Sequence, residues 1–284
     1  MSSTGPSTID PNITLASLMQ DYEQVLGDYV NSNFRMSLRG ELLETDMFID
    51  ASFATGIMSF SATRGPAYNN VQAANGRLIA LYQLAMFMDT IELSWTGEDD
   101  KPYIQDDDFN HLDKEFLTIL GLTVLHSRRE LRKIIEEKTR TPKRTFCFTG
   151  HLESLTTASI LKHFSPDLYI GRELKDVARQ IDHVCNESCP ISCSVFMMDC
   201  FQLRPYQRSE QTEHTILTGD RAYNVKAYRD SGIIANLYSL AENRQSYRIP
   251  EFEIRSFVKP FDAMAVHFPI ERFQEESSSD CEGE

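Results

Sequence analysis

The chain has 284 residues, and its 42 acidic against 28 basic side chains give a formal net charge of −14. This length fits one large domain or two small ones. Apolar residues make up 41% of the chain and charged residues 25%, which is typical of a folded protein and too apolar for a disordered one. A chain this acidic does not suit general binding to nucleic-acid phosphates, so we expect no nucleic-acid partner.

The sequence also argues against membrane insertion and secretion. No apolar run approaches the roughly 20 residues that span a bilayer, so no membrane association is expected. The N-terminal segment is polar and lacks the basic and apolar regions of a secretory signal. The six cysteines are therefore expected to be reduced thiols, in the cytoplasm, the nucleus or both.

The negative charge is concentrated in two segments. Residues 98–113 carry seven acids and one base, and residues 271–284 carry six acids and one base, so they supply −11 of the −14. Residues 128–144 are instead basic, with eight bases and three acids. This segment is expected to be the solvated face of a helix rather than a nucleic-acid patch, since no aromatic residues interleave with its bases.

The N-terminal part of the sequence predicts an arm followed by a helical region. Residues 1–14 lack periodicity and predict a flexible arm. Apolar residues at helical spacing predict an amphipathic helix over 15–30, within a helical extension that covers 15–47. Residues 48–62 then have a β-like pattern, and a polar loop with turn residues follows them.

Strand-like and helix-like segments alternate through the middle of the chain. This alternation predicts a parallel sheet wound by right-handed crossovers. The expected fold class is therefore α/β, a three-layer Rossmann-like domain with a mainly parallel sheet. The predicted strands cover 102–105, 122–125, 145–149 and 168–171, and the predicted helices cover 78–93, 111–120, 130–138, 155–164 and a segment ending near 184.

Residues 185–250 interrupt this alternation and predict a Cys-rich insertion in a domain that spans 48–270. Helices are predicted over 218–231 and 233–243, and two last strands over 252–258 and 263–268. Residues 271–284 predict an acidic disordered tail. In this tail, Ser277 and Ser279 each have an acidic residue three positions later, which makes them candidate phosphorylation sites.

Polar residues and glycines follow several of the predicted strands. Ligands of open α/β sheets bind at the carboxyl ends of the strands, so these residues could line one crevice. Asp106 could accept hydrogen bonds from a ribose or an amine, His151 could act as a general base, and Arg172 could pair with a phosphate or carboxylate. The alternative is that they are turn and capping residues. The candidates are Gly56, Asp106, Gly150, His151, Gly171 and Arg172, with Asp106 and His151 as catalytic candidates.

Neither a dinucleotide site nor a metal site is favoured by the sequence. A dinucleotide fingerprint needs three spaced glycines, and only Gly56 stands in the first turn. Cys185, Cys189 and Cys193 could ligate zinc or an iron–sulfur cluster. Their spacing is not that of the usual sites, so reduced, partly buried thiols are the favoured interpretation. The sequence names no cofactor.

Six segments in order carry a family resemblance: TGIMSFSA, LIALYQLAMFMDTI, PYIQDDDFNHLDKEFLTILGLTVL, TFCFTGH, LYIGREL and FDAMAVHFP. They resemble the SRR1-like family, named for "sensitivity to red light reduced" in plants, and the long acidic block looks most like the fungal branch. The residues in matching places are Gln83, Asp106, Phe109, Asp113, Glu115, Leu120, Gly121, His151, Phe261, Asp262 and His267.

This resemblance implies a regulatory protein on a Rossmann-like scaffold. Members of the family are tied to light signalling and circadian regulation in plants, and to haem metabolism and cytoskeletal stability elsewhere. The resemblance adds His267 to the candidate ligand-binding residues. We therefore expect a regulatory protein whose crevice binds a small ligand or a protein partner. The alternatives are a nucleotide- or cofactor-binding enzyme that uses Asp106 and His151, and a metal-linked redox sensor.

Overall fold

A computed structural model shows an α/β protein whose described residues form two compact units. The first unit comprises 1–152, 164–173 and 244–284, and the second comprises 153–163 and 174–243. The structure describes residues 9–43, 48–62, 70–94, 102–138, 144–150, 154–162, 164–186, 215–218, 221–224, 232–250, 252, 259–261 and 263–270.

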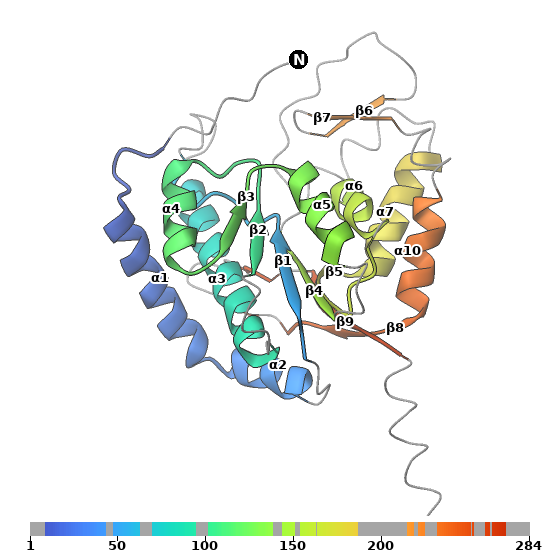
Figure 1. Ribbon diagram of the computed structural model, residues 1–284, viewed down its shortest axis with the longest axis horizontal. Coiled ribbons are helices and arrows are strands. Elements are labelled where there is room, and N and C mark those ends of the chain that lie inside the picture. The colour runs from blue at the N-terminus through green and yellow to red at the C-terminus, as the bar shows by residue number, and fades with distance from the viewer. Residues whose placement is uncertain are drawn as a thin grey trace, which may run out of the picture. The chain divides into compact units, whose positions relative to one another are not determined.

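The first unit is built on a seven-stranded sheet with the order β3-β2-β1-β4-β5-β9-β8 (Figure 1). The strands β3, β2, β1, β4 and β5 are parallel to one another. Strand β9 is antiparallel to both of its neighbours, β5 and β8. The expected mainly parallel sheet is therefore confirmed. The strands are β1 (Ala51–Thr55), β2 (Tyr103–Gln105), β3 (Thr123–Leu125), β4 (Thr145–Thr149), β5 (Leu168–Arg172), β8 (Arg244–Arg248) and β9 (Met264–Pro269).

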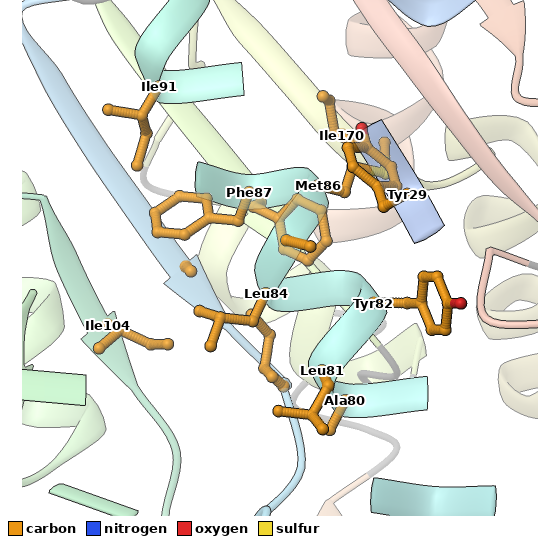
Figure 2. Packing of buried hydrophobic residues seen from close by; sticks show 14 of the residues in the cluster. Tyr29, Ala80, Leu81, Tyr82, Leu84, Met86, Phe87, Ile91, Ile104 and Ile170 are labelled. Carbon is orange, nitrogen blue, oxygen red and sulfur yellow. The ribbon is translucent and has the colours of Figure 1, made fainter. Parts of the chain in front are cut away.

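Helix α3 (Asn70–Ser94) packs between the sheet and two N-terminal helices, α1 (Leu15–Val30) and α2 (Asn33–Leu43). Eight consecutive residues of α3, from 80 to 87, are buried. A helix that is apolar on every side is expected where neighbours cover all of it. Figure 2 shows Leu84 and Phe87 of α3 with Ile104 of β2 and Ile170 of β5 in this core.

Two shorter helices complete the first unit. Helix α4 (His111–Ile119) begins with a capping box formed by Asn110 and Asp113 and contacts both α1 and β3. Helix α5 (Arg128–Lys138) contacts β2 and β3 and buries Leu131 and Ile135. Its remaining side chains are largely charged, which agrees with the predicted solvated face.

One buried ion pair joins the three helices α1, α2 and α3. The guanidinium of Arg35 donates from Nε and Nη2 to Oδ1 of Asp89 at 2.9 and 2.6 Å. The hydroxyl of Tyr29 donates to Oδ2 of the same carboxylate at 3.4 Å. Because Asp89 is almost fully buried, its charge depends on these two partners for compensation.

The second unit consists of three helices and a hairpin in its described part. Helix α10 (Ile233–Glu242) packs against α6 (Ser154–Leu161) and α7 (Leu174–Asn186). It buries Ile233, Leu237 and Ala241, which stand four residues apart on one helical face. Strands β6 (Thr215–Thr218) and β7 (Arg221–Asn224) pair antiparallel.

Two predicted elements near the C-terminus are corrected by the structure. The prediction of a helix over 218–231 is wrong at residues 221–224, which form strand β7. The Gly-Asp pair at 219–220 stands between two β-prone segments, and such a sequence favours a hairpin. The strand that precedes the last one is β8, at 244–248, and the sequence did not predict it. The strand predicted over 252–258 lies outside the described residues, apart from residue 252. Strand β8 is polar because it is an edge strand with exposed residues.

No described helix is both long enough and apolar enough to cross a membrane. Even α3, with 25 residues, does not meet both conditions.

We predict that Arg35→Ala lowers the free energy of unfolding by about 3 kcal/mol, because it leaves the buried Asp89 carboxylate without its cation. Arg132→Ala is the matched control, since Arg132 and Glu136 form an exposed ion pair within α5. The control should cost less than about 1 kcal/mol. Urea unfolding followed by circular dichroism measures both, and equal losses would contradict a special role for the buried pair.

Candidate functional site

Three of the sequence-predicted residues lie side by side at the carboxyl edge of the sheet. Thr55, the last residue of β1, is paired with Gln105 of β2 and with Thr149 of β4. The residues that follow these three are Gly56, Asp106 and Gly150, so they leave the sheet at the same level. The backbone N–H of Gly150 still donates to the carbonyl of Thr55 at 3.0 Å. Adjacent strands are about 4.8 Å apart, so the three backbones are near neighbours.

Arg172 extends this row by one more strand. Strand β5 pairs Ile170 with Phe148 of β4, and continuing that register places Arg172 opposite Gly150. Its side chain is half-buried. We call Asp106, Gly56, Gly150 and Arg172 the edge row. It spans three strand spacings, or about 14 Å, with an acid at one end and a base at the other.

Asp106 is half-buried at the end of β2. Its Oδ1 accepts a hydrogen bond from the backbone N–H of Asp108 at 2.9 Å, which closes a local turn. Burial raises the pKa of this carboxyl to about 7, and the neighbouring carboxylates of Asp108 and Asp107 add to the effect. The Asp108 hydrogen bond and the charge of Arg128 act in the opposite direction. Asp106 can therefore change its charge near neutral pH.

The neighbouring Asp107 has polar partners of its own. The hydroxyl of Thr55 donates to Oε1 of Gln105 at 3.3 Å, and Nε2 of Gln105 donates to Oδ1 of Asp107 at 2.7 Å. The other carboxylate oxygen of Asp107 pairs with Nε of Arg128 at 3.2 Å. The Arg128 guanidinium offsets the charge of Asp107, and these contacts connect Asp107 to the ends of β1 and β2.

Both glycines of the edge row are required by the geometry. Gly56 has a φ of 75°, a conformation that side chains disfavour. A Cβ on Gly150 would lie 2.6 Å from both Oε1 of Gln83 and the carbonyl oxygen of Gly56, which is too close for any real contact. The Nε2 of Gln83 donates to the carbonyl of Pro260 at 2.9 Å, and its buried Oε1 has no hydrogen-bond partner in the described structure.

Gly171, one residue before the end of β5, has a packing role. A Cβ there would collide with the hydroxyls of Thr149 and Tyr169. These two hydroxyls are hydrogen-bonded to each other at 2.8 Å. Because Tyr169 and Gly171 lie on the same face of the strand, the missing side chain leaves the space that the Tyr169 ring occupies.

His267 lies within β9, beside β5, and not at a strand end of the edge row, although it hydrogen-bonds the backbone of Arg172. It is paired with Tyr169 of β5 and Ser246 of β8, and its ring is 5.3 Å from that of Tyr169. Burial and the nearby Arg244 charge lower its pKa to about 3, so the imidazole is neutral at physiological pH. Its Nε2 is buried and has no hydrogen-bond partner within the described part of the chain.

A buried aspartate on α4 holds the loop that follows Gly56. The carboxylate of Asp113 accepts hydrogen bonds from the hydroxyls of Ser59 and Ser61 at 2.6 and 2.7 Å. It also accepts from the backbone N–H groups of Phe60, Ser61 and Asn110 at 3.0–3.1 Å. Sequence reasoning matched Asp113 to a family position without giving it a role, and the structure shows that the role is anchoring.

The remaining sequence candidates lie largely outside the described residues. This is so for His151, Cys189, Cys193, Ser277 and Ser279. Cys185 is part of α7, but its side chain is not described. Among the side chains that are described, no group of three or more metal-ligating residues is found.

Comparison with known proteins decides the family. The sequence model of the SRR1 domain matches residues 73–268. That region is more than half of the chain. The chain belongs to the SRR1 family. No curated protein and no solved structure matches it significantly.

The matched SRR1 region and the edge row overlap only in part. Asp106, Gly150 and Arg172 lie inside 73–268, whereas Gly56 and the whole of β1 precede it. The SRR1 segment LIALYQLAMFMDTI is the buried centre of α3, and its Gln83 reaches the glycines of the edge row. The SRR1 match alone would therefore have missed one strand of the candidate site.

We predict that Gly171→Ala destabilises the protein by about 1–3 kcal/mol, because the added methyl group displaces Thr149 or Tyr169. Gly40→Ala in α2 is the matched control, since nothing lies within 4 Å of a Cβ there. The control should stabilise the helix by about 0.5–1 kcal/mol. Thermal unfolding of the two variants separates these effects, and a neutral Gly171→Ala would show that the space is not needed.

A second prediction concerns Asp106 and the pH dependence of stability. Its pKa is raised from an ordinary 3.8 to about 7 in the folded protein, so ionisation opposes folding as pH rises from about 4 to about 7. Asp106→Asn removes this titration. The variant should therefore gain stability relative to the wild type between pH 5 and pH 8, measured by urea unfolding at both values.

Glu115→Gln, on the exposed side of α4, is the control for that measurement and should show no such gain. A difference between Asp106→Asn and the wild type that is the same at both pH values would contradict the raised pKa.

Proposed function

We propose that this SRR1-family chain is a regulatory protein whose edge row binds a small, ribose-containing ligand. The observation that carries the proposal is the placement of Asp106 beside Gly56 and Gly150 at the carboxyl ends of adjacent parallel strands. Open α/β sheets bind ligands at this edge, near the point where the strand order reverses. Here the order reverses at β1, between β2 and β4.

The chemistry of each position supports such a ligand. A carboxylate after the second strand suits the hydroxyl groups of a ribose, which are hydrogen-bond donors. The two glycines present no side chains, so a ligand can approach the backbone there. Arg172, at the other end of the edge row, suits a carboxylate or phosphate group of the same ligand.

The regulatory part of the proposal is supported by the family resemblance. It favours a role in signalling, of the circadian kind or in the control of haem metabolism, for a protein of the cytoplasm or the nucleus. A protein partner is a further part of the proposal, and Ser277 and Ser279 would be the phosphorylated positions of the acidic tail. On this view, the bound ligand reports a metabolic state to the partner.

A second candidate function is a nucleotide- or cofactor-binding enzyme. The raised pKa of Asp106, about 7, favours it, because a group that titrates near the working pH is suited to proton transfer. His151, which directly follows Gly150 in the sequence, would be its partner. Loss of turnover on His151→Ala with unchanged ligand affinity would favour the enzyme over the purely regulatory protein.

We predict that a ribose-containing ligand raises the melting temperature of the full chain. The test is a thermal-shift screen of nucleotides, S-adenosyl compounds and haem at pH 6 and pH 8. Because the pKa of Asp106 is about 7, most of its carboxyl is protonated at pH 6 and ionised at pH 8. A ligand that donates hydrogen bonds to the carboxylate should bind up to about tenfold more tightly at pH 8.

Asp106→Asn should weaken this binding and remove its pH dependence, whereas Glu115→Gln should leave both unchanged. The proposal fails if no compound stabilises the chain. It also fails if a stabilising compound acts equally well on Asp106→Asn.

A further inference from the structure

We infer that the edge row is built for a nucleoside that carries a cationic centre and a carboxylate, which is the chemistry of an S-adenosyl amino acid, and not for a nucleotide phosphate. The inference rests on the proposed function, because it assigns a ligand class to the same site. Three features carry it: the electrostatics of the β1–β2 end, the backbone around Gly56, and the order of the strands.

The first feature is a concentration of negative charge and hydrogen-bond acceptors. The end of β2 carries three consecutive carboxyl groups, Asp106, Asp107 and Asp108, of which Asp107 is paired with Arg128. Beside them, Oε1 of Gln83 and the carbonyl oxygen of Gly56 both lie close to Gly150, since a Cβ on that glycine would be 2.6 Å from each of them. Two carbonyl oxygens near one another favour a cation or an N–H donor and repel an anion.

The acceptor of Gln83 points to a ligand independently of the acids. The side chain is fully buried, and its Oε1 lacks a donor among the described residues. A buried polar atom without a partner is costly and is rare in folded proteins. An ammonium group of a ligand would supply the missing donor.

The second feature is the absence of a phosphate-binding backbone in the described part of this edge. Helix α3 begins at Asn70, fourteen residues after Gly56, so no helix N-terminus follows the first turn directly. Phosphate sites of Rossmann-like folds depend on that N-terminus. The N–H of Gly150 is already bonded to Thr55, and Arg128 is paired with Asp107. A phosphate would therefore meet repulsion at the β1–β2 end.

The third feature is the strand order. If the seven strands of this sheet are numbered in chain order, β8 is the sixth and β9 the seventh, and the order across the sheet is 3-2-1-4-5-7-6. The seventh strand is antiparallel to its neighbours. Dinucleotide-binding sheets have the order 3-2-1-4-5-6 instead. The inserted antiparallel strand therefore distinguishes this sheet from the dinucleotide-binding type. This difference is one of topology, so it supports the charge argument without replacing it.

The three features place the parts of the ligand along the edge row. The ribose hydroxyls would lie at Asp106, the cationic centre at the carbonyl oxygens of Gln83 and Gly56, and the carboxylate at Arg172. The assignment concerns binding alone.

The test is isothermal titration of the full chain with S-adenosylmethionine and with adenosine 5′-monophosphate. These probes share the adenosine and differ in the group that Gln83 and Gly56 would meet. S-adenosylmethionine should bind at least about tenfold more tightly than the monophosphate. Asp106→Asn and Arg172→Gln should each weaken its binding by about tenfold or more, which is the loss expected for one charge-assisted hydrogen bond.

Glu115→Gln is the matched control and should bind as the wild type does, and circular dichroism confirms that each variant is folded. If the monophosphate binds as tightly and remains sensitive to Asp106→Asn, the ligand class is overturned and the proposed function stands. If neither probe nor any other ribose compound binds, both are overturned. Binding of S-adenosylmethionine that ignores Asp106→Asn would place the ligand elsewhere and would also overturn the inference.

Discussion

The carboxylate of Asp113 is the contact on which the carboxyl edge of the sheet depends. It accepts hydrogen bonds from four groups of the loop after β1, two hydroxyls and two backbone N–H groups, and it caps the start of α4. A fully buried carboxylate is tolerated only when donors satisfy it, and here five donors do so. One side chain therefore fixes the loop after β1 relative to the segment after β2, whereas the register of β1 and β2 sets the level of Gly56 and Asp106.

The sheet could be predicted where its strands are buried on both faces. Strand β4 is buried along its whole length and apolar at its centre, and the sequence predicted it over its observed range, 145–149. Strand β8 was missed because it is a polar edge strand, and its membership of the sheet depends on pairing with β9, which lies about twenty residues later in the chain. Strand pairing between segments so far apart in the chain produces no periodic pattern in the sequence. Helix α1 was predicted over its observed range because its apolar face has a regular spacing.

The candidate site could be predicted only in so far as residues follow parallel strands. Asp106 and Gly150 directly follow strands β2 and β4, and Arg172 ends β5, which runs in the same direction, so a list of strand ends brings the three together. His267 was grouped with them on family resemblance, but β9 runs in the opposite direction and carries it back into the sheet. Strand direction is set by tertiary pairing and cannot be read from the residues of β9. The same limit applies to Gln83, whose contact with Gly150 joins a helix to a strand end about 70 residues later.

The burial of α3 on every side has a consequence for how this protein can be divided. The sequence region that identifies the family begins at residue 73, inside α3, and leaves out α1, α2 and β1. Strand β1 lies between β2 and β4, so a fragment cut at that boundary would split the sheet and expose the apolar surface of α3. Such a fragment would aggregate rather than fold. The region that identifies the family is thus smaller than the unit whose helices and strands pack together, and expression boundaries should be set by the packing of α3.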